Sequence, residues 1–249
     1  MSFYDSEKAL SEYLLFHYGR PEEVLPHEFG PTTALDYPVR CVRHNLALEK
    51  IPSESRALDL GCAVGRSTFE LASLCREAIG IDFSQSFIDA ANQLKESGEM
   101  AYSYLEEGEV RKETMAVVPS DIDRSRAHFE QGDAMDLRDH LGAFDIVLAA
   151  NLLCRLTHPQ RLLERMPGLV NPGGTLILCT PCTWLEEFTA RENWLGGLNG
   201  GPKSTLDGLK DFLDKDFDLS GTRDMPFLIR EHVRKYQWSV ALASIWRRR

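Results

Sequence analysis

The stretch at residues 57–66 (ALDLGCAVGR) constrains the fold more than any other part of this chain, because an apolar run ends in an acid and turns through small residues. The acid that closes the predicted strand is Asp59, and a predicted helix follows at residues 67–74 (STFELASL). The small residues, which let a ligand approach the backbone closely, are Gly61, Ala63 and Gly65. This order of strand, loop and helix is typical of a nucleotide-cofactor site, although a glycine turn alone can also be simple punctuation between strand and helix.

Four more strand-like runs follow this loop, and helical stretches separate them. They are Glu77–Asp82, residues 127–135, Phe144–Ala150 and residues 169–179. The run Phe144–Ala150 is almost continuously apolar, as expected for a parallel strand covered on both faces. Strands that alternate with helices predict a doubly wound α/β sheet, in which ligands gather at the carboxyl ends of the strands.

Acids stand at the ends of these runs. Asp82 follows the glycine loop by about twenty residues, where an acid in this architecture accepts hydrogen bonds from both ribose hydroxyls. Phe83 can then lie against the adenine, and Asp133 and Ala134 end the third strand on the same edge. Each acid alone can be a solvated cap, but the ordered set with Asp59 favours a cofactor site.

Composition is consistent with one α/β domain that carries additions. The chain has 249 residues, 43% of them hydrophobic, which is enough to bury a core. Its formal charge of −10 argues against a nucleic-acid partner. Without a secretory signal or a long apolar span, we expect a cytoplasmic location and no membrane partner. The cysteines are scattered, which suits a reducing compartment, and the pair Cys179 and Cys182 has no second pair at metal spacing, so we expect no metal site.

We expect a single domain over residues 1–249, because no internal repeat or low-complexity linker interrupts the chain. Its expected parts are a helical lid (1–50), a cofactor-binding core (51–180) and a C-terminal part (181–249). The lid is predicted from apolar and aromatic residues at helical spacing near the N-terminus and again over residues 37–48.

Two segments add to the minimal cofactor fold. Residues 99–126 form a polar insertion with a hairpin turn around Gly108, which we expect to help enclose the substrate. Toward the C-terminus a glycine-rich loop (193–202) precedes a predicted helix (204–213). Residues 225–246 then predict two strands joined by a charged turn, the antiparallel hairpin that would complete a seven-stranded sheet.

The spacing Asp-x-Gly-x-Ala-x-Gly at residues 59–65 resembles the first motif of class I S-adenosylmethionine (SAM) methyltransferases, which usually carries glycine where Ala63 stands. The G-x-G-x-x-G motif of a Rossmann dehydrogenase is absent. The resemblance implies a seven-stranded Rossmann-like sheet, SAM as cofactor and S-adenosylhomocysteine as product. It also implies that Asp133 holds the adenine amino group.

Segments from both ends of the chain resemble the 5-thiohistidine N-methyltransferase family of ovothiol biosynthesis. They are EYLLFHYG, ALDYPVRCVRHNL, ALDLGCAVGRSTFELA and PFLIREHVRKYQWSVALASIWRR, within a match from Tyr4 to Arg249. In that family the module is usually the C-terminal domain of a larger enzyme that begins with an iron-dependent 5-histidylcysteine sulfoxide synthase. The resemblance implies methylation of an imidazole ring nitrogen of 5-thiohistidine, giving ovothiol. It leaves open whether this module is fused to or paired with a synthase domain, and which nitrogen is methylated.

For such an acceptor we expect orienting groups rather than a strong base, since a neutral imidazole nitrogen already has a lone pair. Asn151 opens the loop after the fourth strand, beside the expected methyl position, and is a candidate to hold an imidazole N–H or the methionine part of SAM. Arg40 and His44 lie one helical turn apart in the lid, and Arg40 is a candidate partner for a carboxylate. Tyr18 and Tyr37 are candidates for an aromatic wall. Weaker candidates are Arg155, His158 and Glu231.

Each of these residues also has a structural alternative: a turn-forming asparagine, a surface ion pair, or an aromatic ring in the core. Two other functions are also open. One is methyl transfer to another small acceptor, such as a quinone precursor, an amine or a different imidazole. The other is a non-catalytic SAM-fold module that positions a partner enzyme, which the alanine at position 63 permits and the retained acids argue against.

Overall fold

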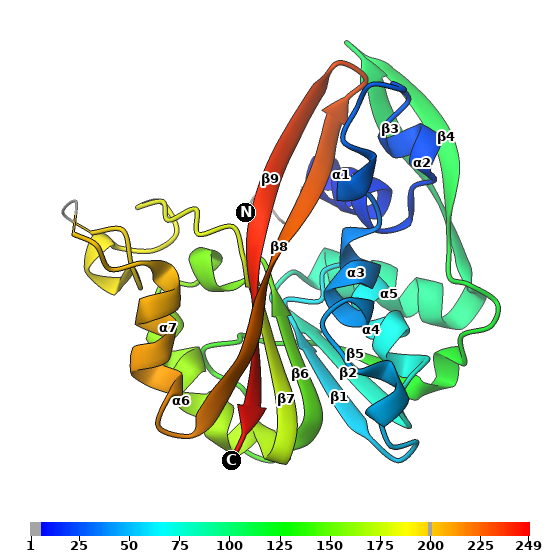
Figure 1. Ribbon diagram of the computed structural model, residues 1–249. Coiled ribbons are helices and arrows are strands. Elements are labelled where there is room, and N and C mark those ends of the chain that lie inside the picture. Colours follow the sequence, from blue (N-terminus) through cyan, green and yellow to red (C-terminus); the bar gives the residue numbers. More distant parts are fainter. Residues whose placement is uncertain (1–5, 199–200) are drawn as a thin grey trace.

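The computed structural model describes residues 6–198 and 201–249, and its centre is a seven-stranded sheet with helices on both faces (Figure 1). The strand order is β5-β2-β1-β6-β7-β9-β8. The strands are β1 (Arg56–Leu60), β2 (Glu77–Asp82), β5 (Ala127–Gln131), β6 (Phe144–Ala150), β7 (Val170–Thr180), β8 (Phe217–His232) and β9 (Lys235–Arg248). The predicted doubly wound, seven-stranded α/β fold is confirmed.

The first five strands in this order, which are β5, β2, β1, β6 and β7, run parallel to one another. The strands β9 and β8 complete the sheet in antiparallel orientation. The chain winds outward from β1 to β2 and β5, then returns to add β6 and β7 on the other side of β1. The winding direction therefore changes between β1 and β6. Open α/β sheets bind ligands at such a switch point, outside the carboxyl ends of the strands.

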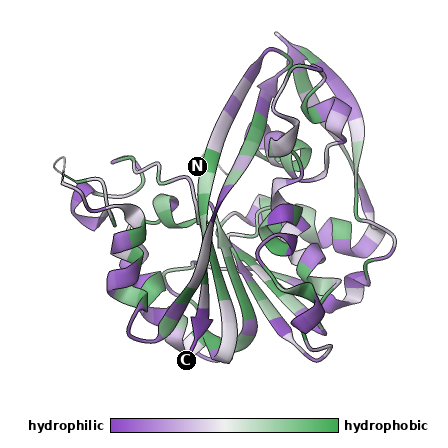
Figure 2. Ribbon diagram, viewed as in Figure 1, coloured by the Kyte–Doolittle hydropathy of each residue, from purple (hydrophilic) through white to green (hydrophobic). Residues whose placement is uncertain are grey.

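Helices cover both faces of the sheet (Figure 1). One face carries α3 (Tyr37–Arg43), α4 (Arg66–Ala72) and α5 (Gln85–Ser97), and the other carries α6 (Pro159–Leu169) and α7 (Thr205–Leu213). Successive strand residues point to opposite faces, so Ala57 belongs to one buried cluster and Leu58 to the other. Figure 2 shows the resulting green, hydrophobic strands between helices that are partly purple.

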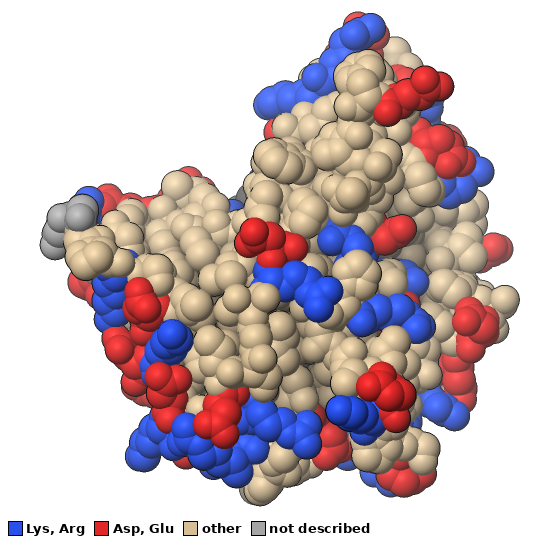
Figure 3. Space-filling model, in the orientation of Figure 1, with Lys and Arg blue, Asp and Glu red and all other residues tan. Residues whose placement is uncertain are grey.

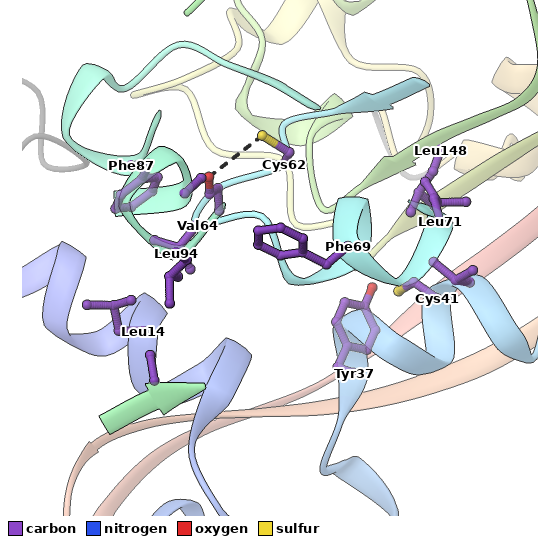
Figure 4. Close-up of a cluster of buried hydrophobic side chains, with 14 of the residues drawn as sticks. Leu14, Tyr37, Cys41, Cys62, Val64, Phe69, Leu71, Phe87, Leu94 and Leu148 are labelled. Carbon is purple, nitrogen blue, oxygen red and sulfur yellow. Dashed lines mark hydrogen bonds between the residues drawn. The ribbon is translucent and has the colours of Figure 1, made fainter. Parts of the chain in front are cut away.

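The cluster beneath α3, α4 and α5 is built largely from aromatic and aliphatic side chains (Figure 4). Tyr37 enters it from α3 and Phe69 from α4, and both rings are almost completely buried. Burial of such side chains contributes about 1.5–3 kcal/mol each, so α3 of the lid is held firmly against the cofactor core.

A second, two-stranded sheet is formed by β3 (Glu99–Glu107) and β4 (Val110–Val117), with Gly108 in the predicted turn. The hairpin of β8 and β9 extends beyond the main sheet as a long arm toward β3, β4, α1 (Glu7–Tyr18) and α2 (Pro21–Val24) (Figure 1). Arg230 of this arm is buried and donates hydrogen bonds to the carbonyl oxygen of Glu23 and the carboxylate of Glu106. The arm, α2 and the β3–β4 hairpin are therefore joined through one guanidinium group.

Several boundaries differ from the prediction. Asp59 lies inside β1 rather than at its end, and the third strand ends at Gln131, so Asp133 lies in the loop that follows. The second lid helix ends at Arg43 because the chain turns there, with the side-chain amide of Asn45 donating to the carbonyl oxygen of Cys41.

The final hairpin is longer than predicted. Residues 218–224 are mostly polar, yet they are β-strand because β9 pairs with them, a long-range contact that local sequence does not reveal. The predicted helix over residues 204–213 is confirmed as α7, which begins after a capping box of Ser204 and Asp207. Of the predicted glycine-rich loop at 193–202, residues 199–200 lie outside the described residues.

Two of the three arginines at the C-terminus form ion pairs with acidic side chains. Arg248 forms an ion pair with Asp216 at 2.9 Å, and Arg249 forms one with Asp218 at 2.8 Å. Figure 3 shows blue and red side chains interleaved along the lower edge of this face, where the C-terminus lies. Arg248 and Arg249 are therefore paired with acids, and Arg247 donates to the hydroxyl of Thr175 at 3.5 Å.

Candidate functional site

A cavity of about 390 Å³ lies at the switch point of the sheet. Its floor comes from the loops after β1, β2, β5 and β6, and its cover comes from α1 and α3. The residues of the floor are Gly61, Ala63, Asp82, Phe83, Gly132, Asp133, Ala134, Asn151 and Leu152, and those of the cover are Tyr13, Phe16, His17, Tyr37 and Pro38. The predicted lid thus contributes directly to the cavity.

The loop at residues 61–65 has the left-handed backbone that its small residues allow. Gly61 has φ +72° and Ala63 has φ +48°, and both line the cavity. Gly65, at φ +88°, does not: a Cβ there would lie 2.7 Å from the ring of Phe129. Gly65 is therefore required by backbone conformation and packing behind the loop rather than by a direct ligand contact.

Asp59 lies beneath this loop and is 1% exposed. Its Oδ2 accepts hydrogen bonds from the hydroxyls of Ser67 (2.6 Å) and Thr68 (2.7 Å) at the start of α4. Burial raises the pKa of Asp59 to about 6, and the two hydroxyls oppose that shift. Asp59 was predicted to face the ligand, but it does not line the cavity, and its bonds to Ser67 and Thr68 hold α4 to β1.

Asp82 ends β2 and lines the cavity, as predicted for the ribose ligand. Its Oδ2 accepts from the backbone N–H of Ala63 and its Oδ1 from that of Ser84, each at 2.9 Å. The neighbouring ring of Phe83 is 64% exposed and also lines the cavity, where it is available to stack on an adenine.

The loop after β5 brings Asp133 and Ala134 to the same cavity. The Oδ1 of Asp133 accepts a hydrogen bond from the backbone N–H of Met135 at 2.8 Å, which fixes the carboxylate at the cavity wall. Asp82, Phe83, Asp133 and Ala134, which the sequence predicts to bind a cofactor, are therefore brought together at one cavity.

Asn151 follows β6 with φ +55°, a left-handed conformation that asparagine tolerates better than most residues. Its backbone N–H donates to the carbonyl oxygen of Cys179 at 2.8 Å, and its Oδ1 accepts from the hydroxyl of Tyr37 at 2.9 Å. Burial raises the pKa of Tyr37 well above its ordinary value, so the phenol keeps the proton that it donates. The bond fixes the amide of Asn151 at the cavity wall.

Three predicted site residues, Tyr18, Arg40 and His44, lie outside the cavity lining. The hydroxyl of Tyr18 donates to the carbonyl oxygen of Val64 at 2.8 Å and so holds the loop from behind. Arg40 donates to the backbone carbonyls of Leu35 (2.7 Å) and Pro226 (2.6 Å). His44 is exposed at the end of α3.

The insertion at residues 99–126, all of which the structure describes, also contributes nothing to the cavity lining, contrary to prediction. Its β3 and β4 pack against α1 instead, so the insertion supports the lid from outside.

Several cavity residues were not predicted as site residues from the sequence. Tyr13, Phe16 and His17 share one face of α1 at helical spacing, a signal that was present but is common in ordinary cores. Phe188 follows β7 in a segment with no recognisable pattern, and the guanidinium of Arg155 lies 4.6 Å from its ring centroid. Burial, with the charge of Arg66, lowers the pKa of His17 to about 3, so its ring is neutral.

This arrangement fits SAM. The volume lies within the range of sites that hold cofactors and other small molecules, and most of its wall is apolar with a few fixed polar groups. A Cβ at Gly61 would lie 3.1 Å from the side chain of Leu152 and would take up space in the floor of the cavity. In the part of the chain that the structure describes, no cluster of His, Cys, Asp or Glu could hold a metal ion, and no helix has the length and apolarity to cross a membrane.

Comparison with known proteins agrees with this geometry. Residues 58–178 match the family model of the methyltransferase domain. Over 123 residues the chain is 26% identical to ubiquinone biosynthesis O-methyltransferase of Coxiella burnetii. That match covers 49% of this chain and 42% of the relative, so the chain spans less than half of the relative's length.

Solved structures share the fold at low identity. A SAM-dependent methyltransferase from Methanosarcina mazei has a TM-score of 0.54 at 19% identity, over 80% of this chain and 95% of that one. The cyclase SpnF has a TM-score of 0.56 at 18% identity, over 90% of this chain and 74% of that one. Residues 58–178 therefore match a methyltransferase domain, and the strand order and the cavity agree with the class I SAM-dependent methyltransferase fold, whose cofactor is SAM and whose product is S-adenosylhomocysteine.

Proposed function

We propose that this chain transfers the methyl group of SAM to an imidazole ring nitrogen of 5-thiohistidine. The resemblance of its terminal segments to the ovothiol family supports this acceptor. In the structure, the proposal rests on one group of side chains that line the cavity. The group combines three aromatic rings with an amide and a guanidinium, from Phe16, Tyr37, Phe188, Asn151 and Arg155. Such a wall suits a small, flat, polar ring that carries an anionic group.

The chemistry requires alignment more than acid–base catalysis. SAM supplies an electrophilic methyl group, and the chain has to hold the ring nitrogen in line with the departing sulfur and exclude water. The thiolate of 5-thiohistidine offsets the positive charge that develops on the imidazole. The guanidinium of Arg155 lies over the ring of Phe188, and its Nη1 donates to the carbonyl oxygens of Cys154 (3.1 Å) and Thr183 (3.4 Å). We propose that this planar group also binds that thiolate or the carboxylate of the amino acid.

The experiment compares 5-thiohistidine with histidine at equal SAM concentration, with methylated product measured by mass spectrometry. We expect 5-thiohistidine to be much the better substrate, because histidine leaves the groups that grip the thiolate without a partner. Arg155→Met should raise the KM for 5-thiohistidine about tenfold or more, as for loss of a hydrogen bond to a charged group. Arg161→Met is the matched control, since Arg161 is exposed on α6 and outside the cavity lining. Equal rates with histidine would contradict the proposal.

A second candidate is O-methylation of a phenolic quinone precursor. The curated relative supports it by name, and the largely apolar cavity wall is compatible with such an acceptor. A panel of catechols in the same assay decides between the two acceptors. If the chain binds S-adenosylhomocysteine but methylates no acceptor of either class, the non-catalytic alternative gains support.

The resemblance also suggests where the acceptor comes from. In the ovothiol family a sulfoxide synthase makes the precursor of 5-thiohistidine, so we propose that such a domain, on the same chain or a separate one, works upstream of this module. Adding a purified synthase and its substrates to the assay should then sustain methyl transfer without added 5-thiohistidine.

A further inference from the structure

The α-carboxylate of SAM still needs a hydrogen-bond donor, because Asn151, the candidate for the methionine part, accepts from Tyr37 through its Oδ1, and Arg155 is proposed to bind the methyl acceptor. Asp82, Phe83 and Asp133 are suited to the ribose and the adenine, while Arg40, the cation predicted for a carboxylate, is bound to two backbone carbonyls outside the cavity lining. SAM carries an α-amino acid at its methionyl end, with a carboxylate that needs a hydrogen-bond donor in a largely apolar cavity.

His17 is a cavity-lining residue whose ring can supply such a donor. It is in the last turn of α1, and the next residue, Tyr18, binds the carbonyl oxygen of Val64 in the glycine loop. His17 therefore lines the cavity beside that loop, with the rings of Phe16 and Tyr13 at centroid distances of 5.4 and 5.9 Å.

The two nitrogens of the His17 ring differ. Nδ1 is buried and has no hydrogen-bond partner, whereas Nε2 is not among the buried atoms without a partner in the described residues. An orphaned buried N–H is rarer in proteins than an orphaned acceptor. The proton of the neutral ring therefore belongs on Nε2, so that Nε2–H is the donor that this cavity-lining ring can offer.

The charge near His17 favours an anion over a cation. Arg66 is close enough to lower the pKa of the ring, and it is only partly balanced by its ion pair with Glu70 at 2.8 Å, since Glu70 also pairs with Arg43. A donor N–H in a positive field selects a carboxylate rather than an ammonium group. We propose that His17 binds the α-carboxylate of the methionyl group of SAM through Nε2–H.

The test uses two ligands that differ in that group. S-adenosylhomocysteine carries the α-amino acid, and 5′-methylthioadenosine lacks it but keeps the ribose and the adenine. Dissociation constants are measured by calorimetry for the wild type and for His17→Phe, which keeps a ring of similar shape and removes the donor. We expect the variant to bind S-adenosylhomocysteine about tenfold more weakly or worse, and 5′-methylthioadenosine within about twofold of the wild type.

Two further variants complete the design. His17→Gln places an amide N–H near the position of Nε2 and should recover most of the lost affinity. His27→Phe removes a histidine of the same N-terminal segment that binds the carbonyl oxygen of Val233, outside the cavity lining, and should leave both constants unchanged.

Two results would overturn the proposal. Equal loss of affinity for both ligands would mean that His17 only supports the lid. Unchanged affinity for S-adenosylhomocysteine, with a raised KM for the acceptor, would mean that the ring serves the carboxylate of the acceptor instead. Because both ligands derive from the cofactor, the result does not depend on which acceptor the enzyme methylates.

Discussion

The Oδ2 of Asp82 accepts a hydrogen bond from the backbone N–H of Ala63 at 2.9 Å, which joins the end of β2 to the glycine loop after β1. The other carboxylate oxygen accepts from the backbone N–H of Ser84. A carboxylate offers about four lone-pair sites, so these bonds leave capacity for the hydroxyls of a ribose. Asp82 is thus suited both to shape the loop and to bind the ligand that lies on it.

Replacing Asp82 by alanine should weaken binding of SAM and S-adenosylhomocysteine at least about tenfold. The variant loses the two charge-assisted hydrogen bonds expected with the ribose, each worth about 1.5–3 kcal/mol. Calorimetry measures the affinity, and Asp139→Ala, which removes an exposed acid outside the cavity lining, serves as control. If Asp82→Ala binds as well as the wild type, the cofactor does not lie where we place it.

Ala63 departs from the usual glycine of the motif, and its φ of +48° explains how that departure is tolerated. Alanine at a left-handed position costs about 1 kcal/mol, and glycine there loses a similar amount through greater backbone freedom in the unfolded chain. Ala63→Gly should therefore change the free energy of unfolding by less than about 1 kcal/mol and leave cofactor affinity intact.

The contrasting variant is Ala63→Val, whose branched side chain suits neither this backbone nor a cavity-lining position, and it should lose both stability and affinity. Thermal unfolding with and without S-adenosylhomocysteine measures both effects. Equal affinities for the valine and glycine variants would show that the loop does not touch the ligand.

The hydrogen bond from Tyr37 to Asn151 gives a test of the methyl-transfer end of the cavity. Tyr37→Phe keeps the buried ring but releases the amide, so kcat should fall about tenfold through lost alignment while cofactor affinity stays the same. Stability should fall by about 1 kcal/mol, the value of one hydrogen bond. Tyr236→Phe is the matched control, because its hydroxyl binds the carbonyl oxygen of Val233 at the far end of the arm. A normal kcat in Tyr37→Phe would remove Asn151 from the proposed mechanism.

The parts of the fold that the sequence predicts well are those in which local pattern and burial agree. The bounds of β2 and β6 match the prediction, because both are short apolar runs buried between neighbouring strands and covered by helices. Asp82 and Asp133 were predicted to share one site because parallel strands bring their carboxyl ends to one edge, and both line the cavity.

The residues whose place the sequence did not predict differ from expectation in the direction in which their side chains point. Helical spacing predicts that Arg40 and His44 lie on one face of a helix, but it does not predict whether that face packs against the cavity, another element or solvent. The structure turns Arg40 to the carbonyl oxygen of Pro226, which is far away in the sequence, and leaves His44 in solvent. His17 was missed for the same reason, since only the packed structure shows that its side of α1 faces the cavity.

Arg40 and His44 therefore should respond differently to substitution. Arg40→Ala breaks the links from α3 to Leu35 and Pro226 and should lower the free energy of unfolding by about 1–3 kcal/mol, because two carbonyl oxygens lose their donor. His44→Ala is a surface change and should stay within about 0.5 kcal/mol of the wild type, with normal turnover. Chemical denaturation and methyl-transfer rates measure the two effects. Loss of turnover in a stably folded His44→Ala would return this residue to the acceptor site.

The contribution of Asp59 to the free energy of unfolding should fall as the pH rises, whereas the contribution of a carboxylate in an ion pair rises with pH. Burial raises its pKa from 3.8 to about 6, so the folded state holds the proton more tightly than the unfolded state does. The stability that this group contributes is complete below about pH 4 and is lost as the pH rises toward 6. Asp59→Asn cannot titrate and can still accept from Ser67 and Thr68, so its stability relative to the wild type should increase over that range by up to about 3 kcal/mol. Urea denaturation at pH 4.5 and pH 7 measures the difference, with Asp139→Asn as control for the loss of one exposed charge. A constant difference between the Asp59→Asn variant and the wild type would show that Asp59 is ionised in the folded protein throughout, held by its two hydroxyl donors despite its burial.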